Sequence, residues 1–367
     1  MARKKVALIL SGGGARGAYQ AGILSAWKDI FRKNGQIEII VGVSAGAINA
    51  VRLMQSAPNY ASGVEAITHL WSTLTPDQIF ESDLKAVVKN LVRLLRSSRH
   101  QRNHGADTSL VNAMLNTAPL YEYLKRNTDM GQVQQRLRTL PDHSLALSCF
   151  DYTDMKNVTF FQTRESCPSW ERPTVRGVRT SLTTEHIMAS CAVPLIFPPV
   201  VMDGHFYGDG SLRNMTPLNA AIRLGAERII NISLRGDSYQ QKNNVAPTLG
   251  RIAATMLDSM FLDAVDLDSQ FMNRINLLAT KVKEEDRDVR VIDLCRVGPM
   301  LDFSLIASKY RKRFPKTLRY LFGGWISSEL LSYLLFDGEY AKDLIECGKR
   351  DGELFLDVVE EWLLNSG

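Results

Sequence analysis

Short apolar runs alternate with longer stretches of helical periodicity over the first part of the chain. Residues 6–10 and 37–41 are mostly apolar, and helix-compatible sequences follow them at 18–31 and 45–55. Apolar runs of about five residues are typical of buried strands, and a βαβα order favours a parallel sheet with helices on its faces. We therefore predict an α/β fold with a mostly parallel central sheet. Further strand candidates, which put the expected end of the sheet at about residue 235, are 144–150, 158–162 and 228–234.

The pattern changes beyond residue 236. Residues 237–244 are polar and predict a linker, after which apolar side chains recur at helical spacing. A chain of 367 residues is long enough for one large domain with an extension. We expect an α/β domain over residues 1–235 and a mainly helical extension over residues 236–367. The apolar residues at helical spacing are Leu257, Met260, Phe261, Ala264, Leu267 and Phe271.

Two segments combine basic and apolar residues. An insertion at about 80–120 contains a predicted basic amphipathic helix, which we interpret as a surface helix packed on the sheet; the alternatives are a lid and a membrane-docking helix. A second cluster fits either an exposed helix end or contact with lipid headgroups. The first segment contains Leu84, Lys85, Val87, Val88, Lys89, Leu91, Arg93, Leu94, Leu95 and Arg96, and the second contains Tyr310, Arg311, Lys312, Arg313, Phe314, Lys316, Arg319, Tyr320 and Trp325.

Charge and cysteine usage narrow the class of protein. Lysine and arginine total 44 against 39 acidic residues, a net charge of +5, which is too weak for a nucleic-acid binder and fits an anionic membrane surface better. The five cysteines form no Cys-x-x-Cys pair, so neither a zinc site nor a disulfide framework is indicated. Because no apolar run approaches the length of a membrane span, we expect a cytoplasmic protein with at most peripheral membrane contact.

The candidate nucleophile is Ser44 in Gly42-Val43-Ser44-Ala45-Gly46, which lies between the second strand and the second helix of the predicted order. A serine on a tight strand-to-helix turn has its hydroxyl exposed to a substrate, and glycines on both sides permit that turn. The alternative is a serine that only caps the helix.

A glycine-rich loop follows the first strand and is the candidate oxyanion site, because backbone N–H groups at a helix N-terminus stabilise negative charge. We expect this loop to lie beside Ser44. The same glycines fit a dinucleotide-binding fingerprint, but the acidic residue, Glu38, lies at the start of the second strand rather than at its end. We therefore predict no bound cofactor. The predicted oxyanion or anion-binding residues are Gly12, Gly13, Gly14, Arg16, Gly17 and Ala45.

The base that would activate Ser44 is predicted to be a carboxylate. The last 162 residues contain no histidine, which argues against a hydrolase triad with a late histidine. Asp209, in Tyr207-Gly208-Asp209-Gly210-Ser211, has glycines on both sides that let it approach another loop. A plain hairpin turn is the alternative for this motif, and His205 either assists or is merely exposed.

With the block from Ala189-Ser190-x-Ala192-x-Pro194 to Phe197-x-Pro199, these motifs occur in the order seen in patatin-like phospholipases, which the chain resembles over roughly residues 5–234. The resemblance implies a three-layer α/β/α fold and a Ser44–Asp209 dyad for calcium-independent hydrolysis of phospholipids or lysophospholipids. The C-terminal part is similar to bacterial members. Gly210-Ser211 departs slightly from the usual Gly-Gly or Gly-Ala. Transacylation and lipid binding without turnover remain alternatives, and no oligomeric state is predicted.

Overall fold

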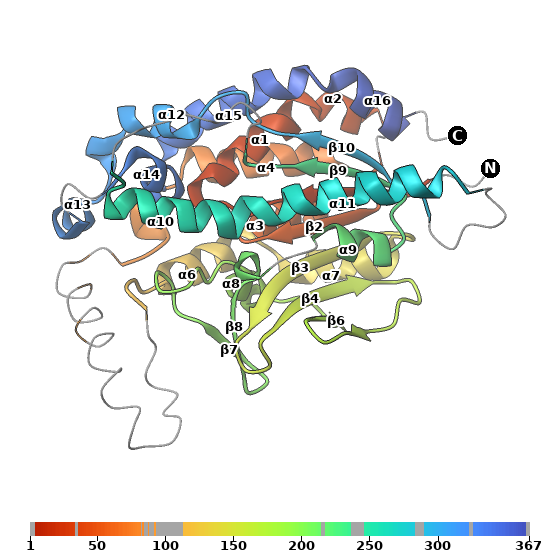
Figure 1. The fold of residues 1–367 in the computed structure, drawn as a ribbon, viewed down its shortest axis with the longest axis horizontal. Coiled ribbons are helices and arrows are strands. Elements are labelled where there is room, and N and C mark those ends of the chain that lie inside the picture. Colours follow the sequence, from red (N-terminus) through yellow and green to blue (C-terminus); the bar gives the residue numbers. More distant parts are fainter. Residues whose placement is uncertain are drawn as a thin grey trace.

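Ten strands form one sheet among the residues that the structure describes (Figure 1). The structure, a computed structural model, describes residues 4–33, 36–81, 83, 87, 92, 113–213, 217–235, 246–282, 290–322 and 326–364. The strands are β1 (Val6–Leu10), β2 (Ile39–Val43), β3 (Ser144–Asp151), β4 (Lys156–Thr163), β5 (Trp170–Glu171), β6 (Val175–Arg179), β7 (Val200–Met202), β8 (His205–Asp209), β9 (Arg228–Ile232) and β10 (Asp293–Val297).

Five neighbouring strands in the order β10-β9-β1-β2-β3 are parallel. Strands β4 and β8 both pair antiparallel to β3, and β7 pairs antiparallel to β8. The prediction of a mostly parallel central sheet is therefore confirmed.

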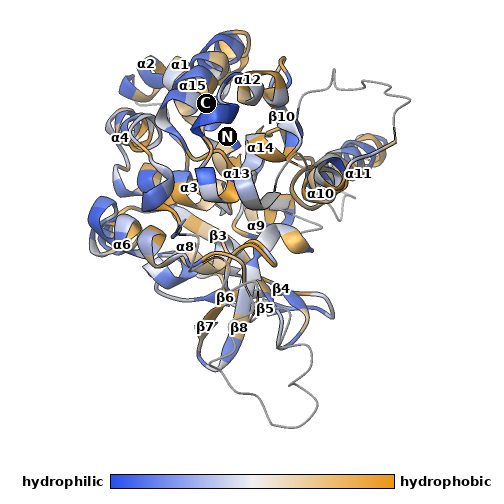
Figure 2. Ribbon diagram, turned by 90° about the vertical axis from the view of Figure 1, so that its left-hand side faces the viewer, coloured by the Kyte–Doolittle hydropathy of each residue, from blue (hydrophilic) through white to orange (hydrophobic). Residues whose placement is uncertain are grey.

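Helices cover this sheet on both faces. They are α1 (Ala18–Ala26), α2 (Lys28–Arg32), α3 (Ala45–Gln55), α4 (Tyr60–Ser72), α6 (Ala118–Asn127), α7 (Met130–Thr139), α8 (Thr184–Ser190), α9 (Pro217–Arg223), α10 (Leu249–Asp258), α11 (Ala264–Ala279), α12 (Phe303–Lys309), α13 (Lys316–Phe322), α14 (Ser328–Leu334), α15 (Gly338–Glu353) and α16 (Leu356–Leu364). A π-helical segment, Ser259–Asp263, joins α10 to α11, and the two helices run as one long arm across the front of Figure 1. In Figure 2 this arm lies apart from α1, α4 and α15.

The side chains of β1 show why its residues are apolar without alternation. Val6, Leu8 and Leu10 point into the larger core cluster, which includes residues of α1, α3, α4 and α15. Ala7 and Ile9 point into a second cluster with residues of α9. Successive strand residues point to opposite faces, so a strand covered on both sides is apolar throughout.

The prediction that the sheet ends near residue 235 is wrong. Strand β10 extends the sheet through parallel pairing with β9, with Asp293 opposite Arg228 and Val297 opposite Ile232. Most of β10 is only partly buried, so its residues lack the continuous apolar pattern of the central strands. The domain boundary at residue 235 stays a prediction.

Several other expectations fall on particular segments. The predicted helix over 18–31 is divided at Trp27 into α1 and α2. Most of the basic amphipathic helix, the polar linker at 237–244 and Trp325 lie outside the described residues. Among the helices that are described, none has the length and apolarity needed to cross a membrane.

Candidate active site

Ser44 lies on a strained turn between β2 and α3. Its backbone has φ 52° and ψ −125°, a conformation that residues other than glycine rarely adopt. A Cβ at Gly42 would lie 2.6 Å from Ala47 Cα, and a Cβ at Gly46 would clash with the carbonyl oxygen of Leu10. The two glycines are therefore required by close backbone approach, as the Gly-x-Ser-x-Gly pattern predicts.

Two residues at the end of α8 hold the backbone of this turn. The Ser44 N–H donates to Ser190 Oγ at 2.9 Å, and Ser190 Oγ donates to the Ser148 carbonyl oxygen at 2.7 Å. The Cys191 thiol donates to the Ser44 carbonyl oxygen at 3.2 Å. Ser190 and Cys191 belong to the block at residues 189–199 that carries part of the family resemblance, and their contacts with Ser44 are not predicted from the sequence.

Asp209 is the last residue of β8 and is completely buried. Its Oδ1 accepts a hydrogen bond of 2.8 Å from the Ser211 N–H, while Oδ2 is buried without a partner. Burial raises the pKa of Asp209 to about 6, and the nearby Ser44 hydroxyl and the Ser211 groups oppose part of that rise. The influence of the Ser44 hydroxyl on this pKa places Asp209 close to Ser44.

The Asp209–Gly210 pair does not form a hairpin turn. It ends β8 and begins a 3-10 helix, Gly210–Leu212. The hairpin between β7 and β8 turns instead at Asp203 and Gly204, which have φ 50° and 81°. The plain-hairpin alternative for Asp209 is therefore wrong.

The glycine loop lies between the Ser44 turn and the 3-10 helix after Asp209. A Cβ on Gly12 would lie 2.7 Å from Ser211 Oγ, and a Cβ on Gly17 would lie 2.8 Å from Ala45 Cβ. Gly14 has φ 57°, and Gly13 precedes the 3-10 helix Gly14–Gly17. This confirms the expectation that the loop lies beside Ser44.

Arg16 has a different environment from its glycine neighbours. Its Nε donates to Ser332 Oγ at 2.9 Å, its Nη1 pairs with Asp258 at 3.3 Å, and its guanidinium lies 3.6 Å from the centre of the Tyr333 ring. The side chain is buried, so these contacts tie the loop to α10 and α14. A contribution of Arg16 to anion binding stays a prediction.

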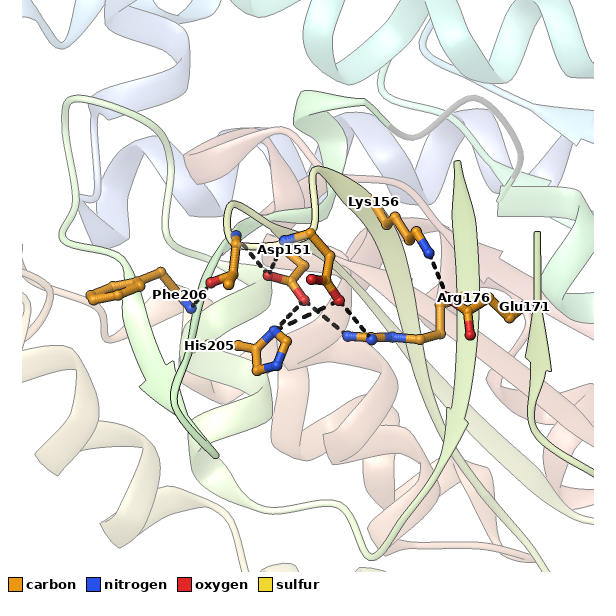
Figure 3. Close-up of polar contacts among 8 residues, drawn as sticks. Asp151, Lys156, Glu171, Arg176, His205 and Phe206 are labelled. Carbon is orange, nitrogen blue, oxygen red and sulfur yellow. Dashed lines mark hydrogen bonds and ion pairs between the residues drawn. The ribbon is translucent and has the colours of Figure 1, made fainter. Parts of the chain in front are cut away.

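His205 pairs with a carboxylate other than Asp209. Its Nδ1 lies 2.8 Å from Asp151 Oδ2, and Arg176 pairs with both Asp151 and Asp154 at 2.9 Å (Figure 3). Asp151, Asp154 and His205 are close enough to bind a metal ion in principle, but the Arg176 guanidinium already supplies positive charge to both carboxylates. We therefore interpret the cluster as a structural ion network.

His186 and Glu38 also have structural roles. His186 Nδ1 accepts a hydrogen bond from the Thr183 N–H at the start of α8, and burial lowers the pKa of His186. Glu38 accepts a hydrogen bond from the Val6 N–H, at the end of β1 opposite the glycine loop. Glu38 therefore lies far along the strand from the glycine loop, whereas a ribose-binding acid belongs at the other end of the second strand.

A narrow cavity of about 40 Å³ begins at Ser44 and is lined by Gly14, Ala45 and mostly apolar side chains. A larger groove of about 830 Å³ shares part of its wall with this cavity. The shared residues are Val193, Ile196, Leu257 and Leu334. Since Ser211 lines the groove as well, the groove reaches the surroundings of Asp209.

Comparison with known proteins identifies a family and similar proteins. The family model described as patatin-like phospholipase matches residues 8–222. A protein described as probable lipid hydrolase 463L, from Invertebrate iridescent virus 6, is 24% identical over 277 residues, covering 74% of this chain and 76% of the viral protein. The crystal structure of VipD from Legionella pneumophila aligns with 94% of this chain and 67% of VipD, at 12% identity and a TM-score of 0.39.

Proposed function

We propose that this chain, which belongs to the patatin-like phospholipase family, is a lipid hydrolase that cleaves fatty-acyl esters of phospholipids or lysophospholipids through an acyl-enzyme. The observation that carries this proposal is the proximity of a strained Ser44, in the wall of an apolar cavity, to a buried Asp209 whose Oδ2 has no partner. The similarity to a viral protein described as a probable lipid hydrolase also supports lipid hydrolysis.

Ser44 and Asp209 have the properties of a nucleophile and its base. Ser44 Oγ attacks the acyl carbonyl carbon while its proton passes to Asp209 Oδ2. The protonated Asp209 then donates that proton to the leaving alcohol. In the second half of the reaction, Asp209 takes a proton from the water that attacks the acyl-enzyme and returns it to Ser44 Oγ as the fatty acid leaves. A pKa of about 6 leaves Asp209 ionised at neutral pH yet more basic than an exposed aspartate.

The proposed oxyanion site consists of the backbone N–H groups of Gly13, Gly14 and Ala45. In the described part of the chain, no hydrogen bond uses these three N–H groups. Gly14 and Ala45 both line the cavity that contains Ser44. Donors that are already in place when negative charge develops on the carbonyl oxygen lower the barrier most.

The apolar lining of the cavity and of the larger adjoining groove together support an acyl chain as the bound group. Ile48, Leu70 and Trp71 are examples of the apolar side chains that line the cavity, and burying methylene groups against them is favourable by about 0.8 kcal/mol for each group. None of the proposed steps uses a metal ion, so we expect activity to be unaffected by chelation of calcium.

A panel of phospholipids, lysophospholipids and a soluble short-chain ester, assayed with the parent protein and Ser44→Ala, tests this function. We expect fatty-acid release by the parent, with and without EDTA, and none by Ser44→Ala. A serine-directed fluorophosphonate should label only the parent. Transfer of the acyl group to an added alcohol would indicate a transacylase, and lipid binding without turnover or labelling would contradict the hydrolase proposal.

A further inference from the structure

The mouth of the 830 Å³ groove carries large apolar side chains that are exposed to solvent. Leu195 and Met256 are each 68% exposed, and Phe271 is 60% exposed. Single exposed apolar residues are common on protein surfaces, whereas several around one groove indicate a binding surface. Leu195 comes from the segment after α8, whereas Met256 and Phe271 come from α10 and α11 of the long helical arm, so two parts of the fold form this mouth.

The backbone of Leu195 is strained. Its φ is 67°, a left-handed conformation that is unfavourable for leucine. The segment is fixed in place by hydrogen bonds from Met114 N–H to the Leu195 carbonyl oxygen and from Leu115 N–H to the Ile196 carbonyl oxygen, both 3.0 Å long. The strain is not explained by core packing, because the Leu195 side chain is mostly exposed.

Positive charge accompanies these apolar residues. Phe314 and Leu318 line the groove, and Lys312 and Lys316, which lie within two residues of them in sequence, have exposed side chains. Arg213, which lines the groove itself, is also exposed, whereas Asp268, the acidic residue in the described lining, is buried. The accessible charge among the described lining residues is therefore basic.

We propose that the groove mouth, formed by Leu195, Met256 and Phe271 together with Lys312 and Lys316, docks on an anionic lipid bilayer. The apolar side chains enter the boundary between headgroups and acyl chains, and the lysines contact the anionic headgroups. This inference rests on the proposed function, since the groove adjoins the Ser44 cavity through apolar side chains that line both.

A bilayer fits this surface better than a protein partner does. A second protein seated on the mouth would cover the groove beside the Ser44 cavity, whereas a bilayer supplies the lipid that the proposed reaction uses. Docking also gives the region after residue 246 a function, because α10, α11 and the segment around α13 build most of the mouth.

Vesicle co-sedimentation with the full chain carrying Ser44→Ala tests docking without hydrolysis of the vesicles. The vesicles contain phosphatidylcholine, either alone or mixed with phosphatidylglycerol. Met256→Asp is compared with Leu354→Asp, because Leu354 is 67% exposed but lies outside the groove, between α15 and α16. We expect Met256→Asp to weaken binding to the mixed vesicles at least about tenfold, since it removes one buried apolar side chain and adds a repelled charge. Leu354→Asp should bind like the parent.

A charge-reversal pair tests the basic part of the surface. Lys312→Glu with Lys316→Glu is compared with Lys349→Glu and Arg350→Glu, two exposed positions on α15. We expect the first pair to weaken binding to mixed vesicles by about tenfold or more, with a smaller effect in high salt, and to leave binding to phosphatidylcholine alone little changed.

Equal binding by the parent, Met256→Asp and the Lys312/Lys316 variant would overturn the docking proposal, as would equal losses in the control variants. Sedimentation velocity without lipid examines the other occupant: self-association that Met256→Asp abolishes, with vesicle binding intact, would assign the surface to a second copy of the chain. Because these measurements use Ser44→Ala protein, they are independent of turnover. A parent that docks but releases no fatty acid would contradict the proposed function and leave docking in place.

Discussion

Asp151 and Asp209 are two completely buried aspartates on the paired strands β3 and β8, and their environments differ. Both oxygens of Asp151 are used: Oδ1 accepts from the Thr153 N–H at 2.8 Å, and Oδ2 contacts Arg176 and His205. Asp209 has a single backbone partner on Oδ1 and none on Oδ2. A buried carboxylate with partners on both oxygens stabilises the fold, whereas one with a bare oxygen is energetically costly and chemically available.

The difference extends to the groups around each carboxylate. Arg176 and His205 surround Asp151 with positive or polar groups at the outer end of the β7–β8 hairpin (Figure 3). Around Asp209, polar groups are instead directed to the backbone of Ser44, through Ser190 and Cys191. Ion pairs thus hold the β3–β8 pair together near Asp151. Near Asp209, hydrogen bonds fix the backbone of Ser44 and one oxygen of Asp209 has no partner.

Asp209→Asn is expected to have the largest effect on activity. The asparagine side chain keeps an acceptor for the Ser211 N–H, which maintains the local fold, but it cannot take the Ser44 proton. Loss of a general base typically lowers the rate by about a hundredfold to ten-thousandfold. The measurement is kcat for a soluble short-chain ester, together with the thermal midpoint. Activity within about tenfold of the parent would mean that another group serves as the base.

Ser190→Ala should have the next largest effect, because it removes the hydroxyl that joins the Ser44 N–H to the Ser148 carbonyl oxygen. Two buried polar groups lose their partner, at a cost of about 1–3 kcal/mol. We expect kcat to fall about tenfold to a hundredfold with KM little changed, since a small displacement of the nucleophile reduces reaction more than binding.

Ser144→Ala is the matched control for Ser190→Ala. Ser144 is buried at the start of β3, and its hydroxyl donates to Thr163 Oγ1 at 2.9 Å. The two variants should lose similar stability, and only Ser190→Ala should lose kcat. If kcat and stability fell in proportion in both variants, Ser190 would have no specific role in positioning Ser44.

A feature is predictable from the sequence when the residues that form it are close together along the chain. The Ser44 turn is local, since Gly42 and Gly46 specify it, and the family inferred from four motifs is confirmed by the match over residues 8–222. The contact of Ser190 with Ser44 joins residues 146 positions apart, and that of Arg16 with Asp258 joins residues 242 apart. No local pattern encodes such pairs, because each arises only when the strands and helices have packed.

The pH dependence of activity tests the role of Asp209 as the base. The pKa of Asp209 is raised from 3.8 to about 6, chiefly by burial. A base is active when deprotonated, so kcat/KM should rise about tenfold between roughly pH 5 and 7 and then level off. The folded state binds this proton more tightly than the unfolded state. The stability contributed by the neutral carboxyl is therefore present below about pH 4 and lost as the pH rises through about 6. Asp209→Asn should remove that part of the stability profile. A rate profile without a transition near pH 6 would contradict the assignment of Asp209 as the base.

Asp151→Asn is expected to have the smallest effect on rate and a clear effect on stability, the reverse of Asp209→Asn. It removes the buried charge that pairs with Arg176 and His205 and leaves them only the partly exposed Asp154, so we expect a loss of about 1–3 kcal/mol in the free energy of unfolding. At urea concentrations below its unfolding midpoint, the variant should retain kcat within a few-fold of the parent, because Asp151 contacts neither Ser44 nor Asp209. Urea unfolding and ester hydrolysis, measured on the same preparation, check both expectations. A loss of kcat as large as that of Asp209→Asn, with stability unchanged, would show that the His205–Asp151–Arg176 network takes part in the reaction and would remove the distinction between the two ends of the strand pair.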